Sequence, residues 1–215
     1  MNIPKSITDN ETLLNEWESL TDDRIIRDGI IHTESWDYAN LKILLVLKNG
    51  YNSDNSTTGW DMRESIRNKE IGITMREASY WMHCILNNLD SPLDITWEDA
   101  FNSILSCAVI NIVKTPESKK SDYQYILTQA NRFDTLLKAQ IEIINPDLII
   151  CGNTWRFLTP IVSGKISRTL GELVHQTEPG FIYMDFWHPS NRFPRLMNCM
   201  TLVNLLRKSG ILPIK

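Results

Sequence analysis

The sequence predicts an α/β fold: a three-layer αβα arrangement around a four-stranded, mainly parallel central sheet. Four short apolar runs, each bounded by polar or turn residues, have the length and character of strands that are buried on both faces. Segments with helical periodicity lie between them, and a parallel return to the same sheet needs such a crossover. The predicted strands span residues 43–47, 108–113, 148–151 and 181–186.

Apolar residues at spacings of three and four predict the helices. One apolar face recurs over residues 78–89, and Thr96 with Asp99 resembles a capping box that opens a short helix. A longer helix is expected over residues 121–144, where Asn145 and the proline after it stop the pattern. These helices would cover both faces of the sheet.

The chain is expected to form one domain over residues 1–215. It has 215 residues, and its nine Gly and nine Pro are scattered, so no flexible linker is visible. Residues 1–40 are expected to be a helical or irregular extension packed on that domain. Residues 164–171 are expected to form a surface loop, and a last helix is expected over residues 196–206.

Charge is distributed unevenly along the chain. The net charge is −4, but residues 1–115 carry 10 Lys/Arg against 18 Asp/Glu, a net −8, and residues 116–215 carry 12 against 8, a net +4. The net charge of the whole chain argues against a strongly basic nucleic-acid binder. The asymmetry is consistent either with a cationic face near the C-terminal elements or with chance.

The cysteines and the apolar segments exclude several classes of protein. The four Cys are separated by 23, 44 and 48 residues, which supports neither a zinc or iron-sulfur site nor a disulfide scaffold. No segment approaches the roughly 18 apolar residues of a membrane span, and the N-terminus lacks a signal-peptide core. We expect a cytoplasmic protein with no metal, no cofactor and no membrane partner.

Polar residues stand at the ends of three predicted strands, where open α/β sheets bind their ligands. Asn49, Gly50 and Tyr51 follow the first strand, Asn111 interrupts the second, and His188-Pro189-Ser190 follows the fourth. No glycine-rich phosphate-binding motif is present. Each residue also has a structural explanation: a buried amide needs a partner, and a histidine beside a serine is often a capping pair.

Taken together, these turns resemble those of the uracil-DNA glycosylase superfamily in residue type, order and approximate spacing. The likeness covers scattered short motifs between about residue 41 and residue 190. The resemblance implies a DNA glycosylase that flips a base out of DNA and hydrolyses its N-glycosidic bond, in repair or in defence against foreign DNA. The base would be uracil or another modified pyrimidine.

The resemblance also implies a role for each residue. His188 would donate a hydrogen bond to the departing base, and Asn49 would orient the attacking water. Asn111 would bind the Watson-Crick edge of the base, Tyr51 would close off the ring's C5 side, and Trp60 would stack on the ring. A core position is an alternative explanation for Tyr51 and for Trp60, and for Trp60 the two explanations fit equally well. The expected DNA-binding residues are Lys48, Ser190, Asn191, Arg192, Phe193 and Arg195.

Departures from the superfamily pattern leave other functions open. Leu47 and Gly50 stand where the superfamily has Gly and Pro, and the last motif continues differently after Ser190. One alternative is a catalytically silent domain of this fold that binds nucleic acid or a protein partner. Another is an unrelated α/β hydrolase that acts on a small nucleoside, although no G-x-S-x-G motif is present.

Overall fold

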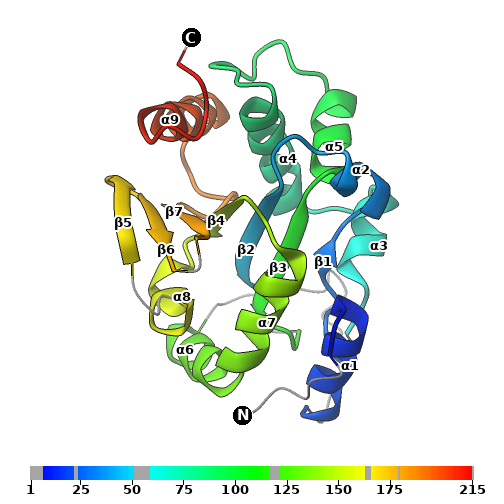
Figure 1. Cartoon of the computed structure of the whole chain (residues 1–215). Coiled ribbons are helices and arrows are strands. Elements are labelled where there is room, and N and C mark those ends of the chain that lie inside the picture. The colour runs from blue at the N-terminus through cyan, green and yellow to red at the C-terminus, as the bar shows by residue number, and fades with distance from the viewer. Residues whose placement is uncertain are drawn as a thin grey trace.

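The computed structural model describes residues 7–21, 24–50, 59–116, 122–162, 166–178 and 180–214. Within these ranges the chain is an α/β protein with one mixed sheet of seven strands, flanked by helices (Figure 1). The strand order is β1-β3-β2-β4-β7-β6-β5. The bounds are β1 Gly29–Ile30, β2 Ile43–Asn49, β3 Ala108–Val113, β4 Leu148–Gly152, β5 Ile166–Gly171, β6 Val174–Thr177 and β7 Ile182–Phe186.

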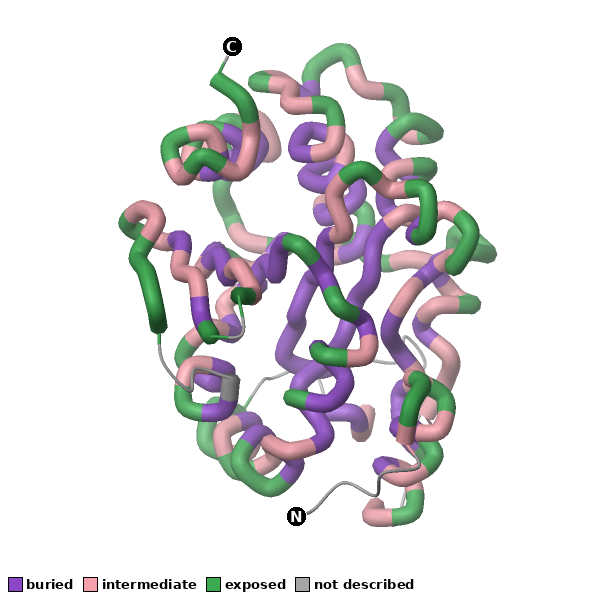
Figure 2. The backbone as a smooth tube through the Cα atoms, viewed as in Figure 1, coloured by how far each residue is buried: buried purple, intermediate pink, exposed green. Residues whose placement is uncertain are grey.

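The four predicted strands form the centre of this sheet. β3, β2, β4 and β7 are adjacent and parallel. Every residue of β2, β3 and β4 is buried, which explains why each appears in the sequence as an uninterrupted apolar run. The buried centre of the molecule follows these strands (Figure 2). Their carboxyl ends all lie at one edge of the sheet.

The sheet has more strands than the four that the sequence predicts, because three antiparallel strands extend it at its sides. β1 pairs with β3, and β6 and β5 add to β7. The expectation of a surface loop up to residue 171 was also wrong, since Ile166–Gly171 is β5. The first four residues of β5 are exposed at the sheet edge, so the strand has no apolar face that a sequence pattern could reveal.

Helices pack against both faces of the sheet and create two cores (Figure 1). One core contains residues of α3, α4, α5 and α9, and the other contains residues of α1, α2, α6, α7 and α8. The first group is α3 Met62–Arg67, α4 Ile73–Leu86, α5 Trp97–Leu105 and α9 Arg195–Lys208. The second is α1 Asn10–Ser19, α2 Thr33–Asp37, α6 Tyr123–Arg132, α7 Asp134–Ile144 and α8 Trp155–Val162.

The helix boundaries confirm the local signals and correct one prediction. Thr96 Oγ1 accepts a hydrogen bond from the Asp99 amide at 3.2 Å and caps α5, and Asn145 ends α7 in the left-handed region at φ 49°. The long helix predicted over 121–144 is two helices, α6 and α7, divided at Phe133. The Phe133 ring packs 5.3 Å from that of Trp17 in α1. No Gly or Pro marks this break, which is why it was not predicted.

Residues 7–40 contribute to both the core and the sheet. Leu13, Leu14 and Trp17 of α1 are buried, and β1 forms one side of the sheet. None of the helices in the described ranges is long and apolar enough to cross a lipid bilayer.

Candidate functional site

The carboxyl edge of the sheet holds a cavity of about 630 Å³. Asn49 at the end of β2, Asn111 in β3 and His188 after β7 all line it, as does Trp60. Leu47 and Gly50 also line it, and the rest of its wall comes from α3, from the segment before α4 and from the first turn of α4. Three polar side chains that are far apart in the sequence therefore meet at one place. The volume lies within the usual range for small-molecule sites, roughly 300–1,000 Å³.

The pleat of the sheet explains why the two asparagines meet. Leu47 and Asn49 point to the same face of β2, and Asn111 pairs with Leu47 across the β2–β3 ladder. Asn111 therefore lies one step deeper along the strands than Asn49. Both are buried, at 1% and 8% exposure respectively.

A glycine at the end of β4 lets the His188 turn approach the sheet closely. A Cβ atom on Gly152 would lie 3.0 Å from Leu47 Cδ2 and 3.4 Å from Pro189 Cδ. Asn153, the next residue, donates its backbone N–H to the Phe186 carbonyl at 2.7 Å. These contacts fix the turn against β2 and β4 and set His188 at the cavity.

Hydrogen bonds and burial keep the His188 imidazole neutral with its hydrogen on Nε2. Its Nδ1 accepts from the Ser190 amide at 3.3 Å and lies 2.8 Å from Ser190 Oγ. Burial and the nearby positive charge of Lys48 lower the pKa of His188 to about 4. Because Nδ1 is an acceptor, the neutral ring carries its N–H at Nε2 and can donate there.

Asn111 uses its amide nitrogen within the fold and leaves its oxygen unpaired. Nδ2 lies 3.4 Å from Asp28 Oδ2 and 3.3 Å from Met62 Sδ. Oδ1 is buried and has no hydrogen-bond partner among the described residues. Such an atom costs free energy unless a ligand or water pairs with it.

Trp60 and Gly50 shape the wall near Asn49. A side chain at Gly50 would collide with Ile26 Cδ1 at 2.7 Å and with Trp60 Cη2 at 3.0 Å. Glycine is therefore needed here for close approach. Trp60 is half-buried and also packs against the core, so both its predicted contact with a ligand and its structural role fit the geometry.

The first turn of α4 faces the cavity without a side-chain cap. Gly72 is the N-cap, and Ile73, Thr74 and Met75 line the cavity. The first N–H groups of a helix have no partner within the helix, and its N-terminus carries a partial positive charge. This end of α4 therefore favours negative charge in the cavity, whereas the Glu70 carboxylate on the same wall opposes it.

Several of the predicted DNA-binding residues have partners within the fold. Arg195 forms a bidentate ion pair with Glu77, with contacts of 2.9 and 2.6 Å, and lies over the Tyr80 ring. Lys48 points to the opposite face of the sheet, where its Nζ is 3.2 Å from Tyr123 Oη. Neither side chain lines the cavity, and the Arg195 charge is neutralised by its partner.

Ser190 and Asn191 also hold the turn together. The Ser190 hydroxyl contacts His188 and lies 3.3 Å from Thr74 Oγ1, and α9 begins only at Arg195. Ser190 therefore belongs to the hydrogen-bonded turn and precedes the start of α9, and its predicted role in DNA binding stays a prediction. Asn191 donates to the His188 carbonyl at 2.8 Å and accepts from the Phe193 amide at 2.8 Å.

Arg192 and Phe193 remain at the surface, together with an aromatic residue that sequence reasoning missed. Trp187 is 46% exposed and Phe193 47% exposed, and their ring centroids are 4.5 Å apart. Arg192, the residue before Phe193, is exposed and forms no ion pair within the described residues. Tyr51, predicted to close the C5 side, lies outside the described residues.

In the described ranges, no group of three His, Cys, Asp or Glu side chains could hold a metal ion. Comparisons with known proteins add no further constraint: no family model and no curated protein matches the chain.

Proposed function

We propose that the chain is a DNA glycosylase that hydrolyses the N-glycosidic bond of uracil or another modified pyrimidine. The observation that carries this proposal is the meeting of Asn49, Asn111 and His188 around one cavity. The family resemblance of their turns gives each of them a role in that reaction. The biological setting would be repair or defence against foreign DNA.

Hydrolysis of this bond leaves negative charge on the departing base, and the cavity contains groups suited to that charge. The neutral His188 ring can donate from Nε2 to a carbonyl oxygen of the base. The uncapped start of α4 adds a positive partial charge on the same wall. Both groups are held in place before the reaction, so they need no reorganisation as charge develops.

The two asparagines would divide the remaining tasks. Asn49 lies nearer the strand end and would orient the water that attacks the sugar. Asn111 lies deeper and would contact the polar edge of the base. Reaching this depth requires the base to leave the DNA stack. The exposed Trp187 and Phe193 rings and the Arg192 guanidinium would contact the DNA beside the cavity.

The test compares His188→Ala with His32→Ala. His32 makes the same type of contact, since its Nδ1 accepts from the Ser35 amide at 3.3 Å and lies 2.7 Å from Ser35 Oγ. It caps α2 and does not line the cavity. We expect wild type and His32→Ala to release a base from oligonucleotides with uracil or a modified cytosine. His188→Ala should be slower by about 10²–10³-fold.

Base release is measured by chromatography of the free base. Equal rates in the two variants would exclude the proposed role of His188. Tight DNA binding without release by the wild-type protein would instead support a silent DNA-binding domain. Release from free nucleosides but not from DNA would support a nucleoside hydrolase.

A further inference from the structure

The unpaired Asn111 oxygen defines what a ligand must offer where Asn111 lines the cavity. Asn111 is 1% exposed, and its Oδ1 has no partner among the described residues. Its Nδ2 already faces Asp28 Oδ2 and Met62 Sδ. An amide in this state can accept a hydrogen bond from a ligand, but both N–H groups of its nitrogen point at acceptors of the fold.

Asp28 fixes this orientation of the amide. Its carboxylate accepts from the Asn111 backbone amide at 2.7 Å as well as from Nδ2. An ionised carboxylate has no hydrogen to donate, so rotating the Asn111 amide would place oxygen against oxygen. The lone pairs of Asp28 therefore hold Nδ2 inward.

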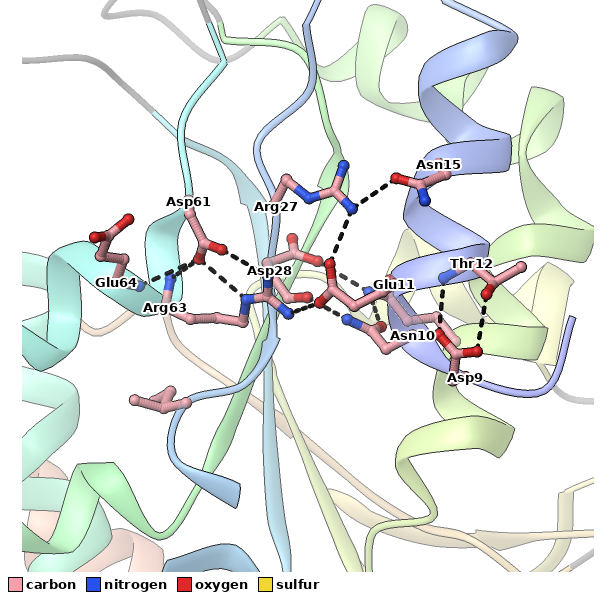
Figure 3. Close-up of polar contacts among 12 residues, drawn as sticks. Asp9, Asn10, Glu11, Thr12, Asn15, Arg27, Asp28, Asp61, Arg63 and Glu64 are labelled. Atoms are coloured by element: carbon pink, nitrogen blue, oxygen red, sulfur yellow. Dashed lines mark hydrogen bonds and ion pairs between the residues drawn. The ribbon is translucent and has the colours of Figure 1, made fainter. Parts of the chain in front are cut away.

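A buried network holds Asp28 in turn. Lys114 Nζ lies 2.6 Å from Oδ1 and 2.9 Å from Oδ2, and Gln140 Nε2 donates to Oδ1 at 3.0 Å. The side chains of Asp28 and Lys114 are 0% exposed. Figure 3 shows Asp28 between α1 and the Asp61–Arg63 pair, with Asn10 beside it. The carboxylate thus has several donors and no room to turn.

We infer that Asp28 is a positioning residue that locks Asn111 as a hydrogen-bond acceptor, so that the cavity selects heterocycles with an N–H group facing Asn111. This inference rests on the proposed function in taking the ligand to be a nucleobase. A uracil-type ring offers its ring N–H, and a cytosine-type ring offers its exocyclic amino group. Asn111 accepts from either and does not distinguish a carbonyl from an amino group on the ring. A pyrimidin-2-one ring offers neither donor.

The first test measures nucleoside binding by ligand-observed NMR, independently of any base release. The probes are deoxyuridine, deoxycytidine and the deoxynucleoside of pyrimidin-2-one. We expect the first two to bind within about threefold of each other and the third at least about tenfold more weakly, because it leaves the buried oxygen unpaired. Equal binding of all three, a large preference for one donor-bearing ring, or binding of none would overturn the inference.

The second test asks whether Asp28 sets this selectivity. The double variant Asp28→Asn/Lys114→Met removes both buried charges together and lets the Asn111 amide rotate. We expect the tenfold discrimination to fall below about threefold. Asn10→Ala is the matched control, because Asn10 contacts the Asp28 carbonyl and Gln140 but not the carboxylate. It should retain the discrimination even if it lowers stability. Unchanged selectivity in the double variant would show that Asp28 is merely structural.

The two proposals fail differently. If the nucleosides bind with the stated selectivity but no base is released from DNA, hydrolysis is wrong and the role of Asp28 stands. If a base is released while the ring without a donor binds as well as the others, the glycosylase proposal stands and the role of Asp28 is wrong.

Discussion

The two faces of the sheet differ, at its carboxyl edge, in how their polar side chains are paired. Lys48 and Asn49 are neighbours in β2, so the pleat directs them to opposite faces. On one face Lys48 Nζ lies 3.2 Å from Tyr123 Oη and 4.7 Å from the centre of its ring. On the other face Asn49 joins Asn111 and His188 around a cavity.

This difference separates buried polar groups that stabilise the fold from those available to a ligand. The Lys48 ammonium has a partner within the fold, whereas the Asn111 oxygen has none among the described residues. Leaving a buried acceptor unpaired costs about 1–3 kcal/mol. A ligand that pairs with it recovers that cost. The unpaired oxygen, together with the cavity that Asn111 lines, is what favours this face as the candidate ligand-binding face.

The largest expected effect concerns the two lysines near these strand ends. Lys114 is fully buried against Asp28, while Lys48 lies on an aromatic ring and has no ion pair within the described residues. Lys114→Met leaves the Asp28 charge uncompensated and should lower the free energy of unfolding by about 3–5 kcal/mol. Lys48→Met should lower it by about 1 kcal/mol or less. Urea unfolding measures both.

The double variant Asp28→Asn/Lys114→Met provides the control for that prediction. Because it removes both charges, it should recover most of the stability that Lys114→Met loses. Equal losses of stability for the two lysine variants would contradict the contrast between an ion pair in the interior and a cation over an aromatic ring.

A second prediction tests the chemistry of the cavity face. Asn49→Asp replaces an amide, which cannot take up a proton, with a carboxylate that can act as a general base towards water. We expect base release to become about tenfold to a hundredfold faster near neutral pH. Single-turnover rates on one oligonucleotide measure this change. An unchanged or slower rate would argue against Asn49 as the residue that positions the water.

The sequence predicts the central strands well and the edge strands poorly, for a physical reason. β2, β3 and β4 are buried on both faces, so every residue in them is selected for packing. β5 contains Ser167, Arg168 and Thr169 at an exposed edge, and β1 has only two residues. Backbone pairing with a neighbouring strand builds these strands, and such pairing leaves little trace in local sequence.

The residues of the candidate site also differ in how well the sequence predicts them. Asn49, Asn111 and His188 stand out as polar residues at the ends of apolar runs, and the fold brings them together. The partner of Asn111 does not stand out, because Asp28 lies 83 residues away and nothing near it signals a buried carboxylate. Arg195 is the reverse case: its charge made it a predicted DNA-binding residue, and the sequence did not indicate its ion pair with Glu77 in α4.

A third prediction concerns the surface beside the cavity. The Trp187 and Phe193 rings lie 4.5 Å apart with their planes tilted by 33°, and both are half exposed, so an unpaired base of DNA can stack on them. Trp187→Ala should weaken binding of a single-stranded oligonucleotide by roughly tenfold, as measured by fluorescence anisotropy. Tyr38→Ala, which removes an 82% exposed aromatic residue elsewhere, should not change it. Equal affinity in the two variants would remove these rings from the DNA contact.

The smallest expected effect is the influence of Lys48, on one face of the sheet, on the pKa of His188, on the other. The positive charge of Lys48 helps to lower the pKa of His188 to about 4, after the larger effect of burial. Lys48→Met should therefore raise the pKa of His188, whereas Lys69→Met, which removes a lysine paired with Glu98 at 2.8 Å, should leave it unchanged. Titration of the imidazole by NMR measures the shift. Identical His188 titrations in wild type and Lys48→Met would mean that Lys48 has no electrostatic influence on the site.

The lowered pKa of His188 also makes the protein less stable as the pH falls. The His188 pKa is lower in the folded protein than the ordinary value of about 6.5, so the unfolded chain takes up this proton first as the pH falls. His188 therefore lowers the free energy of unfolding progressively between about pH 6.5 and pH 4. Lys48→Met raises the pKa of His188 in the folded protein, so the pH range over which stability is lost should end at a higher pH. Urea unfolding at several pH values should therefore show a smaller acid-induced fall in the free energy of unfolding for Lys48→Met than for the wild type.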